Sequence, residues 1–569
     1  MSDQIVTAKP KRWLAIVGLV IMLAGAFLAQ SVRTADGVTV RDIRFAGAKG
    51  AQLSALLYVP KGATPTAKAP GILAVHGYIN SRETQDGFAI EFARRGYVVL
   101  SIDQRGHGYS DGPAFADGFG GPDALAHLRS LPMVDTAEIG LEGHSMGGWT
   151  VLAAAAAMPD AYTSIVLEGS STGAPFAKDG SATWPHNLAL VFSKYDEFSQ
   201  IMWGVDRAMD VNDSAKLQGL FGTKTRVVEG KLYGQIADGT ARVLYQPATT
   251  HPGDHISPTA IGHATDWFAK TLKGGTPKPA SDQIWQWKEF GTGIGLIGFV
   301  MILLGTFDIL VRLPFFVSLQ APAVPALAAR DGKYWRGFTL NTALPALLFF
   351  PTVIFAYVLL TPSVFLPQAV TTQITLWALA GAGASLLIAR FRGGATTGLQ
   401  SDWLRSGLIA IATVAIGYAT LLLIDRVFHT DIRFWVVAVK LPSVGQLGIA
   451  AIYLVPLTLA FLVTLRTLCT TTVTGDSALK RYIWAVLTLT TGFIVFLGVI
   501  YGIFFATGTL ITAFDPLSTV IALQFVPVLA AIAIIGMFTW GRTGSHRAGG
   551  LIVGILVTLY AVAGTATQV

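Results

Sequence analysis

The sequence predicts two structural classes in one chain: an α/β domain with a mostly parallel sheet covered by helices on both faces, and an all-α domain of membrane-spanning helices. The first prediction rests on short apolar runs that alternate with helix-like segments between residues 37 and 273. The second rests on composition, because 52% of the 569 residues are hydrophobic and only 13% are charged. Charges are frequent between residues 31 and 288, whereas residues 289–569 consist mostly of long apolar runs.

The amino-terminal segment predicts a first membrane span. Residues 13–30 are apolar and follow Lys9, Lys11 and Arg12, and a stretch of this length is just enough to cross a bilayer. A cleaved signal peptide shares the positive start, but its apolar stretch is shorter. We therefore favour an uncleaved signal-anchor helix with residues 1–12 in the cytoplasm. Either interpretation exports the residues that follow.

The exported domain is expected over residues 37–273. Strand-like and helix-like segments alternate there, which indicates a parallel sheet with helices on both faces. Ligands of such sheets bind beyond the carboxyl ends of the strands, where His76, Asp103 and Ser145 fall. Residues 170–188 are irregular and are interpreted as a cover of the site, and residues 199–230 as a small lid or insertion. The expected strands lie at 38–45, 53–59, 72–75, 98–102, 138–141, 164–167, 188–192 and 243–246, and the expected helices at 88–95, 124–131, 146–157 and from 258.

The rest of the chain is interpreted as a linker and a membrane domain. Residues 274–288 form the linker, and Trp285 and Trp287 near its end are typical of the aromatic belt at a bilayer surface. About eight further helices are expected within residues 289–569. The expected spans lie at 291–311, 337–360, 371–390, 406–424, 445–465, 482–504, 518–540 and 549–567.

Basic residues predict how these spans are oriented, since short cytoplasmic loops are rich in Lys and Arg. Loops near residues 365 and 510 carry none, and only the loop at 426–444 breaks the alternation, with Arg426, Arg433 and Lys440. This alternation of basic and uncharged loops places the α/β domain and the carboxyl terminus outside the cytoplasm. The protein is accordingly expected to be a multi-pass protein of the plasma (inner) membrane. The basic residues assigned to the cytoplasmic side are Arg312, Arg330, Lys333, Arg336, Arg390, Arg392, Arg405, Arg466, Lys480, Arg481, Arg542 and Arg547.

A glycine-flanked serine is the chemical centre of the sequence. The motif is Gly143-His144-Ser145-Met146-Gly147, between a strand-like run and a helix-like run. That context is the one a nucleophile elbow requires, because the sharp turn leaves no room for side chains two residues to either side. A Gly-rich turn into a packed helix is the alternative interpretation.

The neighbouring blocks extend this motif. They are the run 71–78, which ends in His76-Gly77-Tyr78, the run 97–103, and Arg105-Gly106-His107-Gly108. In this order and spacing they resemble the α/β-hydrolase superfamily over about residues 37–273. The resemblance implies an α/β-hydrolase fold that opens with two antiparallel strands, and the chain order serine, acid, histidine for a catalytic triad.

The resemblance suggests the triad residues. A serine hydroxyl is a weak nucleophile and needs a base, whose tautomer an acid fixes. We expect Ser145 as nucleophile, Asp196 as acid with Glu197 as the alternative, and His255 as base with His251 as the alternative. The expected oxyanion donors are the backbone N–H groups of Met146 and Tyr78.

Several site types are not indicated. No metal-ligand constellation, phosphate loop or dinucleotide fingerprint is present, so no cofactor is expected. The excess of 41 Lys and Arg over 34 Asp and Glu lies largely at the ends of apolar runs, which indicates membrane topology and no nucleic-acid partner. Asp308 and Arg312 are expected to neutralise each other. The small number of charged residues within the expected spans argues against ion-coupled transport. The single cysteine, Cys469, excludes an intramolecular disulfide.

These observations predict a membrane-embedded serine hydrolase. It would cleave an ester or an amide of a small-molecule, lipid or peptide acyl substrate through an acyl-enzyme, on the outer face of the membrane. An acyltransferase or a serine peptidase with the same triad is the alternative. A transport or sensor protein with an inactive hydrolase domain is disfavoured, because all three triad residue types are present.

Overall fold

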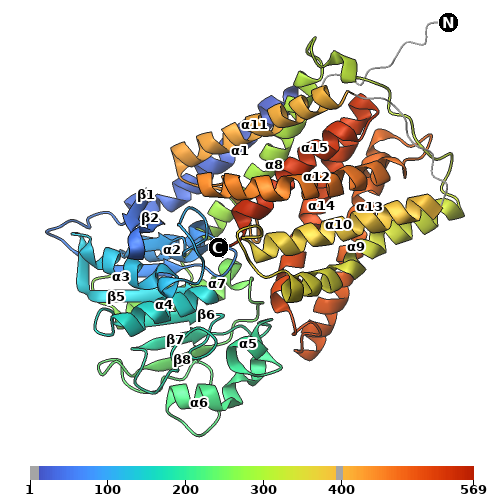
Figure 1. The fold of residues 1–569 in the computed structure, drawn as a ribbon. Helices are drawn as coiled ribbons and strands as arrows, with labels where there is room; N and C mark the ends of the chain where they lie inside the picture. Colours follow the sequence, from blue (N-terminus) through green and yellow to red (C-terminus); the bar gives the residue numbers. More distant parts are fainter. Residues whose placement is uncertain (1–11, 392–401) are drawn as a thin grey trace, which may run out of the picture.

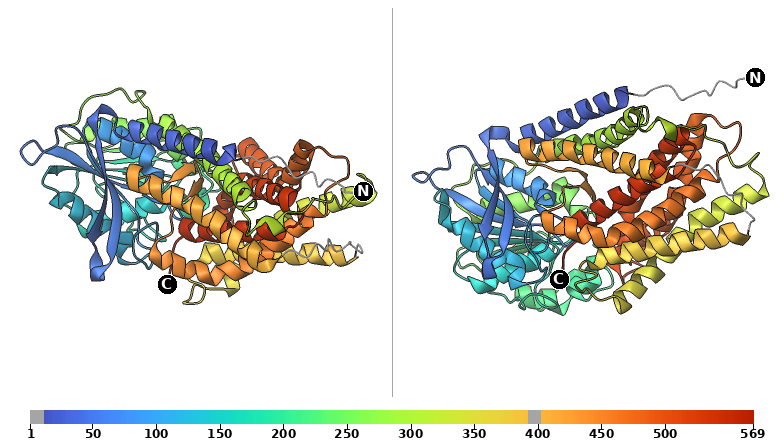
Figure 2. Two further views of the ribbon diagram at one scale, coloured as in Figure 1. Left: turned by 90° about the horizontal axis from the view of Figure 1, so that it is seen from above. Right: turned by 45° about the horizontal axis from the view of Figure 1, so that its top comes forward.

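The computed structural model describes residues 12–391 and 402–569, and combines an α/β domain with a bundle of long helices (Figure 1). Two further views show the α/β domain at one end of the bundle (Figure 2). Lys9, Lys11 and Arg392, on which part of the orientation argument rests, lie outside the described residues. The predicted fold class is confirmed for both parts of the chain.

The α/β domain is built on an eight-stranded sheet with the order β1-β2-β4-β3-β5-β6-β7-β8. Strand β2 pairs in antiparallel fashion with β1 and β4, and all other pairs are parallel. The parallel strands are buried on both faces, which explains their nearly continuous apolar sequences. The strands are β1 (Thr39–Ala46), β2 (Gln52–Val59), β3 (Ala69–Val75), β4 (Val98–Ile102), β5 (Val134–His144), β6 (Ser164–Glu168), β7 (Leu188–Val191) and β8 (Arg242–Tyr245).

Helices cover both faces of this sheet and form two separate cores. On one face α2 (Asp86–Arg94) and α7 (Pro258–Thr271) pack through Phe88, Phe92 and Trp267. On the other face lie α3 (Gly121–Ser130), α4 (Met146–Ala157) and two short helices, α5 (Ser199–Trp203) and α6 (Ala215–Phe221). The segment expected to be a small insertion therefore contributes helical turns to one core.

Within the two described ranges, nine helices are long and apolar enough to cross a membrane. This agrees with the expected spans. Asp308, inside one of them, pairs with Arg312 at 3.3 Å, as expected, and also with Arg542 at 2.5 Å. The nine helices are α1 (Trp13–Arg33), α8 (Trp285–Leu310), α9 (Gly332–Leu359), α10 (Ala369–Phe391), α11 (Trp403–Phe428), α12 (Val444–Cys469), α13 (Ala478–Thr507), α14 (Pro516–Thr543) and α15 (Arg547–Gly564).

Helices α1 and α8, which precede and follow the α/β domain, pack side by side. Their glycines make this close approach possible: a Cβ on Gly25 would lie 2.3 Å from the carbonyl oxygen of Gly291, and one on Gly18 would lie 2.7 Å from that of Gly298. Small residues at a helix interface are a common means of association in membranes. The α/β domain is thus attached to the bundle by two packed helices.

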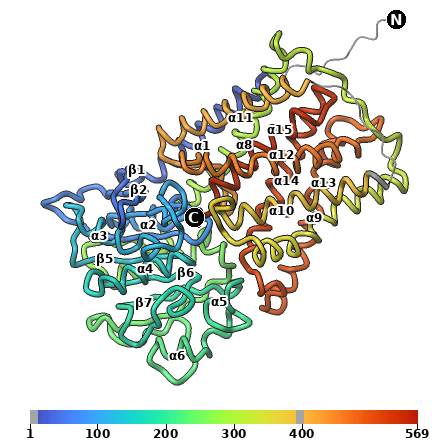
Figure 3. Tube along the Cα trace, viewed as in Figure 1, coloured from blue at the N-terminus to red at the C-terminus, as the bar shows by residue number. Residues whose placement is uncertain are grey.

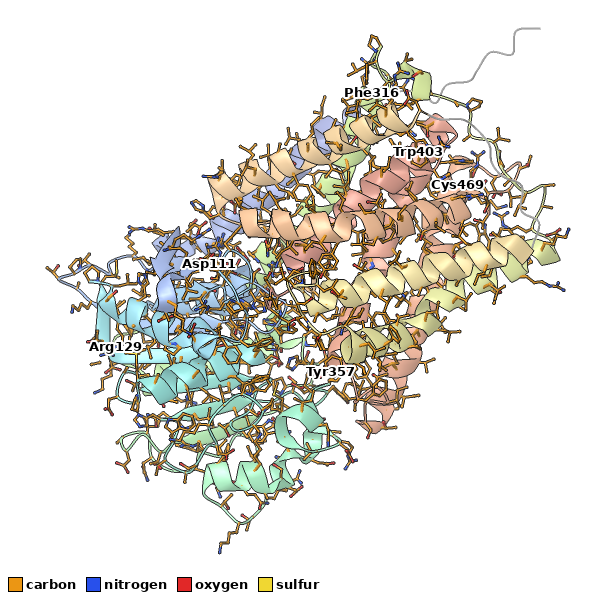
Figure 4. All side chains as sticks on the ribbon, viewed as in Figure 1. Asp111, Arg129, Phe316, Tyr357, Trp403 and Cys469 are labelled. Atoms are coloured by element: carbon orange, nitrogen blue, oxygen red, sulfur yellow. The ribbon has the colours of Figure 1, made fainter. Side chains whose placement is uncertain are left out.

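The two ends of the bundle differ. The carboxyl terminus lies at the junction with the α/β domain, and α1 begins toward the far end (Figures 1 and 3). Phe316, Trp403 and Cys469 also lie toward the far end, whereas Asp111 and Arg129 lie in the α/β domain (Figure 4). The α/β domain and the carboxyl terminus therefore share one end, as the orientation argument requires.

Two details differ from expectation. Trp285 is buried against the core of the α/β domain, so it is not part of an aromatic belt, whereas Trp287 is exposed. The loop at 426–444 forms a β-hairpin of β9 (Ile432–Phe434) and β10 (Val437–Val439), and its Arg433 reaches into the α/β domain. Arg433, one of the three basic residues that break the orientation pattern, thus makes a contact with the α/β domain.

Candidate active site

Ser145 sits in a strained turn between β5 and α4. Its φ is +55° and its ψ is −121°, a conformation that costs energy for any residue with a side chain. A Cβ on Gly143 would lie 2.3 Å from the carbonyl oxygen of Gly147, and one on Gly147 would lie 2.1 Å from that of Val75. Neither position can accept another residue without backbone movement. The turn is therefore a nucleophile elbow in geometry as well as in sequence.

The loops after β7 and β8 bring an acid and a histidine together. The Nδ1 atom of His251 lies 2.8 Å from Oδ2 of Asp196. Oδ1 of Asp196 accepts a hydrogen bond from the backbone N–H of Phe198 at 2.8 Å, which fixes the carboxylate. A parallel bridge between Tyr195 and Thr250 joins the two loops next to this pair. Burial lowers the pKa of His251 to about 3, so its imidazole is neutral, the form that a general base requires.

The geometry favours His251 over His255, against the preference stated from the sequence. Neither ring nitrogen of His255 has a hydrogen-bond partner among the described residues. Its ring packs 4.0 Å from the ring of His144 and 6.4 Å from that of Phe88. His255 lies in the 3₁₀ turn Asp254–Ile256 that precedes α7, and its ring packs between His144 and Phe88 of α2, whereas the ring of His251 contacts the acid.

Glu197, the alternative acid, supports the loop of His251. Its Oε2 accepts a hydrogen bond from the backbone N–H of His251 at 2.8 Å, and its Oε1 accepts one from the hydroxyl of Tyr501 at 2.8 Å. Burial and the neighbouring Asp196 raise the pKa of Glu197 to about 8. Tyr501 belongs to α13, so a membrane helix is hydrogen-bonded to the residue that follows the candidate acid.

The loop after β3 lies against the serine. A Cβ on Gly77 would lie 3.1 Å from Cβ of Ser145. His76 is held in place, because its Nε2 accepts from the backbone N–H of Gln104 at 3.1 Å. Burial keeps its pKa well below the usual range, so the ring is neutral and supports the loop.

The expected oxyanion donors border the serine. Met146 follows it in the chain, and Tyr78 follows Gly77. Among the described residues, neither backbone N–H donates to a protein acceptor. Two free N–H groups beside a nucleophile are what an oxyanion hole needs. The hydroxyl of Ser145 likewise makes no hydrogen bond to His251 in this structure, a common feature of substrate-free sites.

The membrane domain covers the site, and sequence reasoning missed this. The indole N–H of Trp435 in the hairpin donates to the carbonyl of Pro252 at 2.7 Å, directly after His251. The ring of Tyr195, directly before Asp196, packs edge-on against Phe505 at 5.1 Å. Near the carboxyl terminus, Thr567 accepts a hydrogen bond from the N–H of Ala114 at 2.7 Å. The hairpin and α13 thus contact the loops that carry His251 and Asp196, and the carboxyl-terminal segment contacts the loop after β4.

No cluster of three or more metal-ligating side chains occurs in the part of the chain that the structure describes.

Comparisons with known proteins agree with this fold. The family described as serine aminopeptidase, S33, matches residues 67–195, a range that includes Ser145 and ends directly before Asp196. A mitochondrial palmitoyl-protein thioesterase of Rattus norvegicus is 31% identical over 131 residues, which cover 22% of this chain and 41% of the relative. The chain thus spans less than half the length of that relative.

Two solved structures are similar to part of this chain. A hypothetical protein of Pseudomonas aeruginosa is 28% identical over 24% of this chain and 43% of its own, with a TM-score of 0.22. A dienelactone hydrolase-like promiscuous phosphotriesterase from metagenomic libraries is 14% identical and covers 41% of this chain and 99% of its own, with a TM-score of 0.30. The sheet topology and the elbow at Ser145 give the domain between α1 and α8 an α/β-hydrolase fold, and the family match lies within this domain.

Proposed function

We propose that the protein is a membrane-bound serine hydrolase that cleaves an acyl substrate through an acyl-enzyme. Ser145 is the nucleophile, His251 the general base and Asp196 the acid that orients it. The observation that carries the proposal is the 2.8 Å contact between His251 and Asp196, in loops at the same edge of the sheet as the elbow. Ser145 stands at the end of β5, two strands from β7.

The reaction follows from these roles. Nε2 of His251 takes the proton of the Ser145 hydroxyl as its oxygen attacks the acyl carbonyl, and Asp196 stabilises the imidazolium. The N–H groups of Met146 and Tyr78 receive the negative charge that develops on the carbonyl oxygen. His251 then gives the proton to the leaving group, and water releases the acyl group by the same steps in reverse. Esters and thioesters are the favoured substrates, because the relative in Rattus norvegicus is described as a palmitoyl-protein thioesterase.

Labelling with a fluorophosphonate tests this proposal, since the reagent reacts only with an activated serine. We expect the purified full-length protein to be labelled at Ser145, and the peptide that carries the label to be identified by mass spectrometry. A screen of ester, thioester and aminoacyl substrates, each with water or an alcohol as acceptor, then separates a hydrolase from a peptidase or an acyltransferase. Absence of labelling would contradict the proposal.

We further propose that the catalytic domain faces away from the cytoplasm in the plasma membrane. Positive side chains support this orientation, because Arg405 and Arg466 lie within three residues of Trp403 and Cys469, which are at the end of the bundle remote from the α/β domain (Figure 4). A cysteine in place of Ser281, near the α/β domain, is expected to react with an impermeant maleimide when the outer face of the membrane is accessible. A cysteine in place of the exposed Val324, between α8 and α9, is expected to react only after lysis. Both variants use the Cys469→Ala background, and the opposite pattern would place the chemistry in the cytosol.

From the hydrogen bond between Tyr501 and Glu197 we expect the membrane domain to influence kcat, because it helps to position the loop of His251. Tyr501→Phe removes the hydroxyl and leaves Oε1 of Glu197 without this partner. A lost hydrogen bond to a buried group costs about 1–3 kcal/mol, so we expect kcat to fall roughly 5- to 150-fold with KM little changed. Tyr357→Phe, at a lipid-exposed position of α9, is the matched control. Equal kcat values for both variants would show that the contact does not position the His251 loop.

A further inference from the structure

The membrane domain contains a large apolar groove between α8 and α14. Its volume is about 540 Å³, within the range of about 300–1,000 Å³ typical of small-molecule sites. Its walls include Leu296 and Leu304 of α8, Ala531 and Ile535 of α14, and Val557 of α15. Nearly all of the lining is hydrocarbon, so water is a poor occupant and an apolar chain a good one.

The dimensions of the groove fit a single chain better than a protein helix. The stretch from Leu296 to Leu304 corresponds to about 12 Å at the helical rise of 1.5 Å per residue. A packed transmembrane helix makes contact over about twice that length. The groove also opens beside Ile297, which is 60% exposed on the outer surface of α8. Its opening therefore faces the region that lipid tails occupy.

The groove shares walls with a smaller cavity beside the loop that follows β3. Tyr560 lines both of them, and β10 of the hairpin contributes Val437 to the groove and Ala438 to the cavity. The cavity has a volume of about 40 Å³, and Ile79 and Asn80, which follow the candidate oxyanion donor Tyr78, also line it. Trp435, whose indole bonds to Pro252 beside His251, forms another part of its wall. Hence the cavity lies next to the loop of the candidate oxyanion donor Tyr78 and to the hairpin residue that bonds to the loop of His251, and Tyr560 and β10 form walls of both the cavity and the groove.

We propose that the substrate is a long-chain acyl lipid of the membrane, whose hydrocarbon chain lies in the groove between α8 and α14 while its acyl carbonyl reaches Ser145 past Tyr560. This inference rests on the proposed function. It gives the membrane domain a role in recognition: the chain is taken directly from the bilayer, and the scissile bond meets the serine where the hairpin covers it. No new chemical step is needed, because the acyl group is transferred to Ser145 and then to water.

A groove-filling variant tests the proposal. Ala531→Trp places an indole in the groove, and Ala415→Trp places the same side chain at an exposed position of α11 that does not line the groove. Turnover of p-nitrophenyl esters from acetate to palmitate is measured in nanodiscs. Each methylene that is buried strengthens binding roughly fourfold, so we expect kcat/KM of the unsubstituted protein to rise steeply with chain length. Ala531→Trp should lose at least tenfold on palmitate and less than twofold on acetate, and Ala415→Trp should change neither.

A second measurement reports occupancy without activity. A phospholipid with a diazirine in its acyl chain is expected to crosslink to α8 and α14, and Ala531→Trp should reduce this crosslink. Equal effects of Ala531→Trp on acetate and palmitate, no chain-length preference, or crosslinks confined to other helices would each overturn the proposal. Crosslinking in the groove without chain-length preference would identify a structural lipid. Failure of the proposed function is distinguished separately, because fluorophosphonate labelling of Ser145 requires no occupant in the groove.

Discussion

Replacement of Ser145 by alanine is expected to abolish fluorophosphonate labelling and to lower acyl hydrolysis roughly 10⁴- to 10⁶-fold, the range found when a nucleophile is removed from a triad. The physical reason is that the other groups act only through the serine oxygen: His251 has no proton to accept, and the oxyanion donors have no tetrahedral intermediate to stabilise. The measurement is kcat on an activated ester together with in-gel labelling.

The fold should survive this change. Alanine, like serine, has a Cβ, so the strain at φ +55° is the same in both proteins. Ser164→Ala is the matched control, because Ser164 is also a buried serine but lies at the start of β6, at the opposite edge of the sheet. We expect both variants to keep the elution volume and the thermal midpoint of the unsubstituted protein within a few degrees. Full hydrolytic activity in Ser145→Ala would end the serine-hydrolase interpretation.

Local sequence predicted the fold because the relevant signals are local. Buried parallel strands appear in the sequence as short apolar runs, and membrane helices appear as long apolar runs. The elbow requires glycine at positions 143 and 147, because a Cβ at either position would collide with backbone atoms. The nine spans and the alternation of the α/β domain follow from such signals. The sequence also indicates that the candidate site lies at the carboxyl ends of the strands, since His76, Asp103 and Ser145 each directly follow a strand.

The remaining features depend on contacts between distant residues. Nothing in the sequence indicates that Tyr501, more than 300 residues after Glu197, is hydrogen-bonded to it. One signal was present, because Arg433 and Lys440 lie in a loop that should lack positive charge. In the structure Arg433 donates to Ser81 at 2.8 Å and lies 3.7 Å from Glu83. A basic residue that breaks the expected alternation of charge can therefore indicate a partner on the neighbouring domain.

The choice between the two histidines shows the limit of spacing arguments. His251 and His255 lie in one loop, and the chain order serine, acid, histidine is satisfied by either. Which ring faces Asp196 is decided by the turn at Asp254–Ile256, whose direction depends on packing against Phe88 and His144. The sequence could not decide which of these two histidines is the base, and replacement of each one tests the choice.

His251→Ala is expected to lower kcat roughly 10⁴- to 10⁶-fold, about as much as loss of the serine, because the base and the nucleophile act as a unit. Without the imidazole no group accepts the serine proton, and Asp196 is left buried without its hydrogen-bonded partner. His255→Phe should retain most of the activity, since its ring nitrogens have no partner among the described residues and phenylalanine preserves the packing against Phe88. Stopped-flow measurement of acylation with an activated ester gives the comparison, and circular dichroism checks that both variants fold. If His255→Phe were the inactive variant and His251→Ala the active one, the 2.8 Å contact to Asp196 would be structural and the base would lie four residues later in the loop.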